Sequence, residues 1–293
     1  MWHLAEIPQV AHFYWGGPTL SYLRFLTVKT FQRFNPDWRV RFYCPRAPYS
    51  GKNPWGNGVG GDKDTLGANL SCKDYSGEIG KIPNTEIIQV DFEALGIGDV
   101  PDVYRSDLLR LKVLGDDGGL YSDMDIVYFR PMEGAYFNVP EQSGTNTVIS
   151  FHPTRREYSI GFLMSGKNNP LFQSLYEQGV DAISSCSSPT DYQRLGVKMW
   201  HGSVADPDVM IGKFPSLKVH NIEMELTYAI DYVRIGAIYE GNVEYRTPKT
   251  IALHWYGGHP LGKKWENNIQ EETVKNFNTT LVNTIKDSLS KTG

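Results

Sequence analysis

Residues 118–129 read Gly118-Gly119-Leu120-Tyr121-Ser122-Asp123-Met124-Asp125-Ile126-Val127-Tyr128-Phe129, and no other stretch says more about the chain. Its two carboxylates, Asp123 and Asp125, stand one residue apart at a glycine-loosened turn beside an apolar, β-branched run. Because side chains alternate across a strand, both carboxylates can point the same way. The preceding glycines let the backbone approach a bound group closely. Two hard oxygen ligands that leave coordination positions open suit Mg²⁺ or Mn²⁺ shared with a substrate diphosphate.

Asp-x-Asp spacing alone is weak evidence, because it occurs twice more, at residues 62–64 and 206–208. The first lies in a glycine-rich stretch and the second contains a proline, so both are interpreted as solvated loop carboxylates. The context of the pair at 123–125 sets it apart from these two.

A helix is predicted directly upstream of the acidic pair. Residues 102–115 place leucines and a tyrosine near one face at helical spacing. The same helix carries Asp107 and Arg110 three positions apart, close enough to act on one ligand or on each other. The alternative interpretation is a surface salt bridge followed by a turn.

Composition narrows the class of protein. The 293 residues can bury one sizeable core, and 40% hydrophobic with 21% charged residues is ordinary for a soluble globular protein. A net charge of −4 does not indicate the positively charged surface that binding to nucleic acid or to an anionic membrane requires. The seven Trp and seventeen Tyr suit stacking on sugars and bases, although most are expected in the core.

The cysteines and the N-terminus predict a cytoplasmic location. Three cysteines, far apart and in no metal-ligand spacing, do not suggest a disulfide framework. The first residues lack the charge and apolar run of a signal peptide, and no stretch approaches the length of a membrane span.

The apolar pattern alternates between strand and helix periods, which predicts an α/β sheet with helices on its faces in a single domain over residues 1–293. The predicted strands are 10–15, 40–44, 86–91, 147–151, 160–164, 209–214 and 250–254, and the helices are 19–34, with Thr19 as its N-cap, 102–115 and 170–183.

Two further segments stand out. Residues 45–83 are rich in Gly, Asn, Asp and Lys, which predicts an irregular insertion that is functional or disordered. Residues 271–289 carry apolar residues about four apart, which predicts a closing amphipathic helix over about 267–290. Packing on the domain is the expected use of its apolar stripe, and weak docking to a membrane surface or a partner is the alternative.

Four separated pieces of the chain together resemble the retaining, metal-dependent glycosyltransferases of the GT-A fold. They are similar to the DXD families that include yeast outer-chain mannosyltransferases, capsular polysaccharide enzymes and the large clostridial glucosylating toxins. The matching pieces are residues 7–17 (the opening strand), 104–110 (Ser-Asp-x-x-Arg), 118–125 (Gly-Gly-x-Tyr-x-Asp-x-Asp) and 254–258 (His-x-x-Gly), followed by Lys263, Lys264 and Trp265.

The resemblance implies the α/β GT-A fold, a Rossmann-like mixed sheet flanked by helices, and roles for the matching residues. Asp123 would meet the ribose or a metal-bound water, Asp125 would ligate the metal directly, and His254 would be a further ligand. Asp107 and Arg110 would hold hydroxyls of the donor sugar. The implied donor-binding residues are Tyr14, Trp15, Tyr121, Gly257, Gly258, Lys263 and Lys264, with Trp15 stacking on the base and a lysine on the diphosphate.

Transfer of a sugar from a nucleotide requires these residue types independently of the resemblance. Breaking the anomeric C–O bond leaves negative charge on the nucleoside diphosphate, so a divalent cation and a lysine stabilise the transition state. Hydrogen bonds to the sugar fix its orientation, which lowers the barrier further.

Structural alternatives stay open for several of these residues. Trp15, in a glycine-flanked strand end, could be a core residue, and His254 could be a satisfied histidine at the end of a strand. Asp191 could cap a helix or lie near the reacting face of the sugar, where it would be catalytic. Asp116 and Asp117 are expected on the exposed end of a helix.

The chain also departs from the family pattern. Asp116-Asp117 replaces the usual aromatic or lysine positions, the insertion at 45–83 is not helical, and the acceptor-side asparagine expected after Ile160-Gly161-Phe162 is not evident. These departures bear on the acceptor and not on the donor chemistry.

We therefore expect a Mn²⁺- or Mg²⁺-dependent transfer of a hexose from a nucleotide sugar, UDP first and GDP second, to a hydroxyl of a glycan or another acceptor. No pair of carboxylates can be assigned as nucleophile and acid in the manner of glycosidases, which favours same-face attack and retention. The alternatives are a non-catalytic carbohydrate-binding protein that holds Ca²⁺ and a metal-dependent nucleotide-sugar hydrolase.

Overall fold

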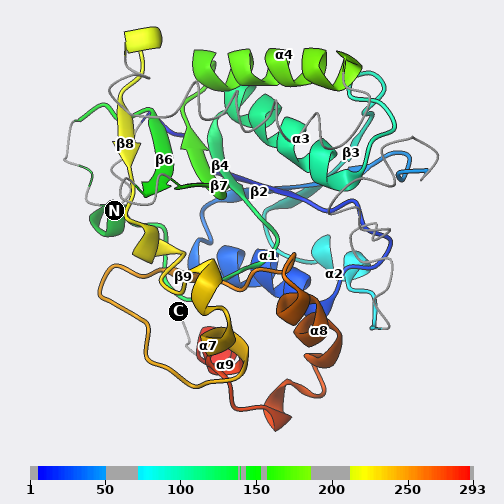
Figure 1. The fold of residues 1–293 in the computed structure, drawn as a ribbon, viewed down its shortest axis with the longest axis vertical. Coiled ribbons are helices and arrows are strands. Elements are labelled where there is room, and N and C mark those ends of the chain that lie inside the picture. Colours follow the sequence, from blue (N-terminus) through cyan, green and yellow to red (C-terminus); the bar gives the residue numbers. More distant parts are fainter. Residues whose placement is uncertain are drawn as a thin grey trace.

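A computed structural model describes residues 6–50, 72–137, 139, 143–152, 157–185 and 212–290. A mixed sheet runs through the middle of the molecule, with helices on both faces (Figure 1). Its strands are β1 (Val10–Tyr14), β2 (Arg39–Pro45), β3 (Thr85–Val90), β4 (Gly119–Ser122), β6 (Thr147–His152), β7 (Glu157–Ser165) and β8 (Val219–Asn221).

The order of the seven strands is β3-β2-β1-β4-β7-β6-β8. The first four pair in parallel, β7 is antiparallel to β4 and β6, and β8 is parallel to β6. A second, two-stranded sheet joins β5 (Ile126–Tyr128) and β9 (Ala252–His254) in antiparallel register. The predicted α/β mixed sheet is therefore confirmed.

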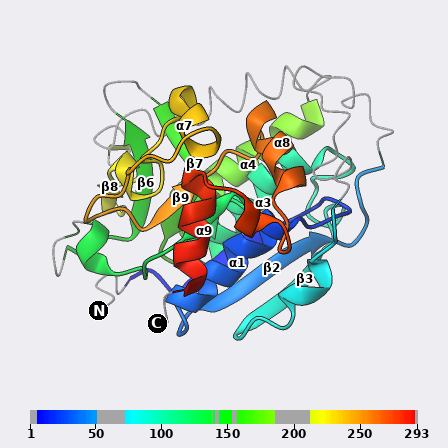
Figure 2. The same ribbon diagram turned by 90° about the horizontal axis from the view of Figure 1, so that it is seen from below.

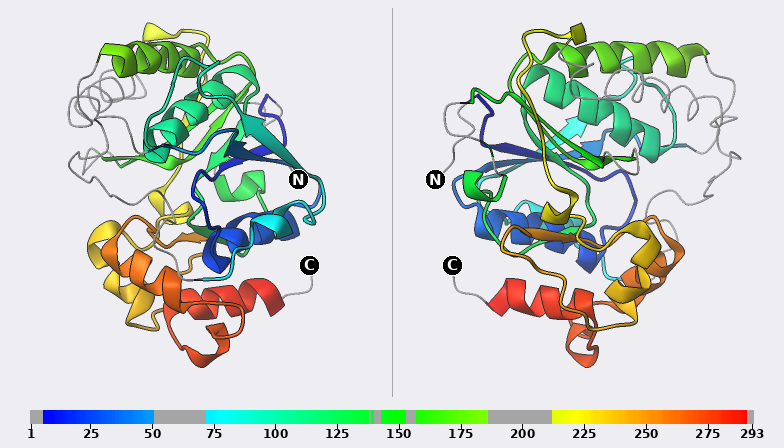
Figure 3. Two further views of the ribbon diagram at one scale, coloured as in Figure 1. Left: turned by 90° about the vertical axis from the view of Figure 1, so that its right-hand side faces the viewer. Right: turned by 60° about the vertical axis from the view of Figure 1, so that its left-hand side comes forward.

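Helices form layers on either side of the sheet (Figure 1). They are α1 (Tyr22–Phe34), α2 (Ser76–Ile79), α3 (Asp102–Asp116), α4 (Pro170–Ser185), α7 (Gly236–Tyr239), α8 (Pro260–Asn268) and α9 (Thr280–Ser290), with short 3₁₀ turns η2 (Gly134–Phe137), η3 (Met224–Leu226), η4 (Tyr232–Arg234) and η5 (Val274–Asn276). Helices α3 and α4 cover one face and α1 the other, while the C-terminal helices gather on the α1 side (Figures 2 and 3). None of the helices in these ranges combines the length and the apolar character needed to cross a bilayer.

Alternation along β1 builds a core on each face of the sheet. Ala11 and Phe13 pack in the cluster that contains Leu23 of α1, whereas Tyr14 packs with Leu108 of α3. Successive strand residues point to opposite faces, so a single strand can serve both layers. Because β1 and β4 pair in parallel, the segments that follow these two strands lie at the same edge of the sheet.

Three sequence predictions are corrected by the structure. The N-cap of α1 is Ser21, whose hydroxyl accepts the Arg24 N–H, and not Thr19. The closing helix begins only at Thr280, because Phe277 is extended and Thr279 then accepts the Val282 N–H as a cap. The strand predicted over residues 209–214 is wrong at its described end, where residues 212–213 are helical, and residues 209–211 lie outside the described ranges.

The apolar stripe of α9 is used inside the molecule. Leu281, Val282 and Ile285 are fully buried, and α9 contacts β5 and α7. Packing on the domain is therefore the role of this helix, and the membrane-docking alternative has no support. Of the insertion predicted over 45–83, residues 51–71 lie outside the described ranges, and the remainder includes the short helix α2.

His12 on β1 ties the glycine turn before β4 to the sheet. Its Nε2 lies 2.8 Å from the Gly118 carbonyl oxygen and its Nδ1 lies 2.9 Å from the Tyr43 hydroxyl. Gly118 and Gly119 have φ of +67° and +98°, and a Cβ on Gly119 would collide with the Val10 carbonyl oxygen. Only glycine fits such a backbone, which explains the pair in the sequence. The contacts suit a neutral imidazole that donates from Nε2 and accepts at Nδ1.

Acid is expected to destabilise the protein through His12. Burial lowers the pKa of His12 from 6.5 to about 4, although the hydrogen bond with the Gly118 carbonyl opposes the shift. The unfolded chain therefore binds this proton first as the pH falls through 6.5, and the free energy of unfolding drops until about pH 4, by about 3 kcal/mol in total. Urea unfolding at pH 7 and pH 4.5 measures the loss. His12→Gln, which cannot titrate, should show a shallower pH dependence, and an equally steep one would contradict the assignment.

Candidate functional site

The acidic pair lies in the turn that connects β4 with β5, directly before the apolar strand β5, so strand alternation does not set the directions of its two carboxylates. Three hydrogen bonds hold this turn. The Asp123 N–H donates to the Gly161 carbonyl (2.8 Å), the Thr27 hydroxyl donates to the Met124 carbonyl (2.8 Å), and the Trp255 N–H donates to the Asp125 carbonyl (2.8 Å). Segments from β7, α1 and the end of β9 thus fix the backbone on which both carboxylates stand.

The β5–β9 pairing brings His254 to the acidic pair, because Ile126 is opposite His254 in the register. The Nε2 atom of His254 lies 3.1 Å from Oδ1 of Asp125. Oδ2 of Asp125 accepts the Gly257 N–H at 2.7 Å, so the loop after β9 reaches the same carboxylate. The carboxylates of Asp123 and Asp125 and the His254 ring can each offer one ligand atom within 4.8 Å of the others.

This arrangement fits a divalent cation. Adjacent ligands of an octahedral Mg²⁺ or a similar ion stand about 3 Å apart when each bond is about 2.1 Å, which matches the separation between Asp125 and His254. The Nδ1 atom of His254 is also buried without a hydrogen-bond partner among the described residues. Two carboxylates and an imidazole are suitable ligands for Mn²⁺ or Mg²⁺.

Asp125 is held in its charged form. Burial raises the pKa of Asp125, but the charge and hydrogen bond of His254, the charge of Arg24 and the Gly257 N–H together outweigh burial, so its pKa lies well below the usual range. A carboxylate that is ionised at neutral pH can bind a cation without first losing a proton.

Arg110 joins two carboxylates at the side of the site. Its Nη2 lies 2.8 Å from Oδ1 of Asp123 and its Nη1 lies 3.3 Å from Oδ1 of Asp107. The Arg110 guanidinium is buried over the ring of Tyr121, whose hydroxyl pairs with Ser106 (2.8 Å). The side chains of Asp107 and Asp123 are each 31% exposed, so both can face a ligand. Tyr121 thus supports Arg110 rather than presenting a surface of its own.

Burial also shifts the pKa of the Asp107 carboxyl. Burial raises the pKa of Asp107 to about 6; Arg110 opposes this shift and the negative charge of Asp123 adds to it. The carboxyl is therefore charged at neutral pH but close to its titration range, which suits a group that exchanges hydrogen bonds with sugar hydroxyls.

Gly161 on β7 leaves room for the site. A Cβ at this position would lie 2.5 Å from Oδ2 of Asp123 and 2.8 Å from the Tyr228 hydroxyl oxygen. In the sequence, this glycine stands out only as a neighbour of the missing acceptor-side asparagine. Because glycine has no side chain, Asp123 and Tyr228 can pack directly against the strand at this position.

Gly161→Ala should therefore lower activity while leaving the fold intact. The new methyl group must push the Asp123 carboxylate away from its position, and we expect a loss in kcat/KM of about 10²-fold from displacement of about 1 Å. Gly77→Ala is the matched control, because nothing lies within 4 Å of a Cβ there. Steady-state kinetics of both variants give the comparison, and equal activity in the two would show that Asp123 does not need its position.

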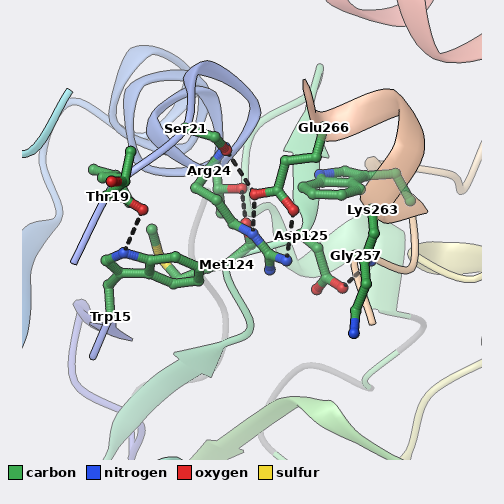
Figure 4. A network of polar contacts seen from close by, with 12 residues as sticks. Trp15, Thr19, Ser21, Arg24, Met124, Asp125, Gly257, Lys263 and Glu266 are labelled. Atoms are coloured by element: carbon green, nitrogen blue, oxygen red, sulfur yellow. Dashed lines mark hydrogen bonds and ion pairs between the residues drawn. The ribbon is translucent and has the colours of Figure 1, made fainter. Parts of the chain in front are cut away.

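A buried ion pair lies on the other side of Asp125 (Figure 4). Nε of Arg24 on α1 lies 2.8 Å from Oε1 of Glu266 on α8, and the Ser21 hydroxyl donates to the same oxygen at 2.6 Å. The Arg24 guanidinium stacks on the rings of Trp15 and Trp255, at 4.9 and 4.7 Å from their centroids. Neither charged residue was predicted from the sequence to belong to the site. The sequence does show an arginine within the apolar stripe of the helix, which indicates a buried charge. It does not indicate which residue pairs with that arginine.

Trp15 is packed as a core residue, which was its alternative interpretation. It is 5% exposed, its indole N–H donates to the Thr19 carbonyl (3.1 Å), and Arg24 covers one face of its ring. Tyr14 points to the opposite face of the sheet, where its hydroxyl donates to Asp102 (2.6 Å). Neither ring presents an open surface to a nucleotide in this structure.

The loop after β9 and helix α8 complete the site. Gly257 lies so close to Arg24 that a Cβ would collide with Nη2, whereas a Cβ on Gly258 would meet nothing within 4 Å. Lys263 is half-buried and extends from α8 past Gly257 on the Asp125 side (Figure 4), and Lys264 is exposed. Asp191, the remaining predicted catalytic residue, lies outside the described ranges, as do residues 62–64 and 206–208.

Comparisons with known proteins agree with this geometry. Residues 100–149 match the family model described as glycosyltransferase sugar-binding region containing DXD motif. A search of curated proteins finds no match.

Several solved structures resemble the chain. The apo form of the glycosyltransferase GlyE of Streptococcus pneumoniae TIGR4 has 11% identity and a TM-score of 0.51, covering 97% of this chain and 61% of GlyE. The PaToxG glycosyltransferase has 17% identity and a TM-score of 0.41, covering 71% of this chain and 75% of its own. The catalytic domain of alpha-toxin from Clostridium novyi has 12% identity and a TM-score of 0.37, covering 67% and 64%. The chain spans about three fifths of the length of GlyE.

The family match contains both the helix that bears Asp107 and Arg110 and the acidic pair. It confirms the resemblance to DXD glycosyltransferases, and the likeness to GlyE supports the GT-A fold. The family match supports a glycosyltransferase.

Proposed function

We propose that this chain is a metal-dependent glycosyltransferase that moves a hexose from a nucleotide sugar to a hydroxyl of a glycan or another acceptor, with retention at the anomeric carbon. The observation that carries the proposal is the convergence of Asp123, Asp125 and His254 beside Arg110 and Asp107 of α3. A UDP-sugar is the first candidate donor and a GDP-sugar the second.

The proposed ligands of Mn²⁺ or Mg²⁺ are Asp125, His254 and Asp123. A divalent ion there would neutralise the charge that develops on the diphosphate as the anomeric bond breaks. Lys263 is proposed to add a second positive charge, because it is half-buried on the Asp125 side of α8 (Figure 4). The Gly257 N–H keeps the Asp125 carboxylate oriented through its hydrogen bond of 2.7 Å.

Asp107, Asp123 and Arg110 are proposed to orient the donor sugar. Each carboxylate shares the Arg110 guanidinium and keeps oxygens that can accept from sugar hydroxyls. Among the described residues, no pair of carboxylates can be assigned as nucleophile and acid in the manner of glycosidases. We therefore infer that the acceptor hydroxyl attacks from the face that the diphosphate leaves. Its proton then goes to the departing diphosphate oxygen.

The proposal is tested by assaying transfer and hydrolysis across a panel of UDP- and GDP-sugars with Mn²⁺, before and after chelation with EDTA. We expect one donor class to react, with activity lost on chelation and restored by added Mn²⁺, and an α-linked donor to give an α-linked product by NMR. Turnover at the same rate with and without acceptor would indicate a hydrolase instead. Tight binding of free glycans without any nucleotide affinity would indicate a carbohydrate-binding protein.

A further inference from the structure

The hydroxyl of Tyr228 is a buried polar group that the proposed mechanism does not use. Tyr228 follows the 3₁₀ turn η3 and is 7% exposed, and its N–H donates to the Met224 carbonyl (2.7 Å). Its ring lies 4.9 Å from the His254 ring, centroid to centroid. No described residue forms a well-aligned hydrogen bond with its hydroxyl oxygen, although the Ser159 side chain interacts with it. Burial of a hydroxyl without a partner costs free energy, so a partner is expected in some state of the protein.

Glycine 161 shows where this hydroxyl points. A Cβ on Gly161 would lie 2.8 Å from the Tyr228 hydroxyl oxygen and 2.5 Å from Oδ2 of Asp123. Both oxygens therefore lie next to Gly161 on β7, on the side where its Cβ would be. Tyr228 spans the space between two of the proposed metal ligands, with its ring against His254 and its hydroxyl toward Asp123.

The pair of groups is suited to a particular ligand. Asp123 can only accept hydrogen bonds when it is charged, and a phenol can donate one. A tyrosine hydroxyl ordinarily titrates near pH 10, so it keeps its proton at neutral pH and can donate, roughly as an unperturbed phenol does. A ligand hydroxyl placed between the two would donate to Asp123 and accept from Tyr228. A phosphate oxygen, which cannot donate, would satisfy Tyr228 but not Asp123.

We propose that the Tyr228 hydroxyl donates a hydrogen bond to a hydroxyl of the nucleotide-sugar donor, the same hydroxyl that donates to Asp123. This inference rests on the proposed function. The hydroxyl belongs either to the donor hexose or to the ribose, and the two are distinguished by comparing a nucleotide sugar with the bare nucleoside diphosphate.

Tyr228→Phe tests the proposal because it removes one oxygen and leaves the ring in place. Calorimetric titration with Mn²⁺ and UDP, UDP-glucose, GDP or GDP-mannose gives the affinities. We expect the affinity of the reacting donor to fall about 5- to 15-fold, as for the loss of one hydrogen bond. A loss confined to the nucleotide sugar assigns the contact to the hexose, and an equal loss for the bare diphosphate assigns it to the ribose.

Thermal unfolding separates a binding role from a structural one. Without ligand, Tyr228→Phe should leave the Tm unchanged or raise it, because the variant loses no well-aligned hydrogen bond. Tyr245→Phe is the matched control, since the Tyr245 hydroxyl lies 2.8 Å from the Thr284 hydroxyl, and it should lower the Tm and leave donor affinity unchanged.

Each contrary result has a distinct meaning. If the wild type binds these donors and Tyr228→Phe binds them equally well, the assignment of Tyr228 is overturned and the proposed function stands. A lowered Tm with unchanged affinity would show that the hydroxyl is structural, which also overturns it. If the wild type binds none of the four ligands with Mn²⁺, the proposed function fails and this inference fails with it.

Discussion

Asp125→Asn is expected to lower kcat/KM for glycosyl transfer about 10³-fold, equivalent to about 4 kcal/mol of transition-state stabilisation. Asparagine has nearly the same shape and can still accept the Gly257 N–H, which is 2.7 Å from Oδ2 in the wild type. It cannot supply the negative charge that a cation requires, and it leaves His254 without its partner at 3.1 Å. The variant therefore tests the charge of the site with the least change in packing. Steady-state kinetics with the reacting donor give the comparison.

Metal binding provides an independent measurement of the same change. At a Mn²⁺ concentration about 100 times its Kd, the wild type should gain about 2.7 kcal/mol in free energy of unfolding, and Asp125→Asn should gain little. Asp117→Asn serves as the control, because Asp117 is exposed and its partner is Arg41, at 2.6 Å. That variant should behave as the wild type does in both assays. A metal-induced stabilisation of Asp125→Asn equal to that of the wild type would remove Asp125 from the ligand set.

Glu266→Gln is expected to destabilise the protein by about 3–5 kcal/mol, which is the usual cost of breaking a buried ion pair by removing one partner. The side chains of Arg24 and Glu266 are only 8% and 4% exposed, and two contacts of 2.8 and 3.2 Å join them. Without the carboxylate, the guanidinium stays between two tryptophan rings with its charge uncompensated. Denaturant unfolding at pH 7 measures the loss.

A double variant separates the charge from the packing. Arg24→Met combined with Glu266→Leu removes both charges and should recover much of the stability lost in Glu266→Gln, because an apolar pair of similar volume replaces the ion pair. Glu78→Gln is the control, since Glu78 pairs with Lys81 on the surface, and its unfolding midpoint should stay close to that of the wild type. Equal midpoints for Glu266→Gln and Glu78→Gln would mean that the buried pair contributes nothing to stability.

The ion pair also connects stability with the site. Glu266 and Lys263 stand on the same helix, α8, and Arg24 contacts the Gly257 segment that holds Asp125. A change in the position of α8 should therefore reach the proposed diphosphate side of the site. Recovery of stability in the double variant without recovery of activity would be consistent with this connection.

Much of the fold could be predicted because neighbouring residues carry the signal. Five elements lie within a few residues of their predicted bounds: strands β1, β2 and β3 and helices α3 and α4. In each of them the buried apolar residues recur in the sequence at the regular spacing of a strand or a helix. The helix over 267–290 was misjudged for the same reason. Its apolar spacing continues through 271–279, but an extended residue and a threonine cap interrupt the backbone there.

For the site, local pattern identified Asp123, Asp125, Asp107 and Arg110, which lie within nineteen positions of one another on one helix–turn–strand unit. The contacts of His254, Glu266 and Tyr228 arise differently. His254 reaches Asp125 only through the β5–β9 register, and Glu266 reaches Arg24 across 242 positions of sequence. Periodicity tells which way a side chain faces, but strand register and helix packing choose its distant partner. The amino-acid order alone thus specified the acidic pair and its helix, and the family resemblance marked His254. Folding in three dimensions brought His254 to Asp125 and selected the ion pair and the tyrosine that surround them.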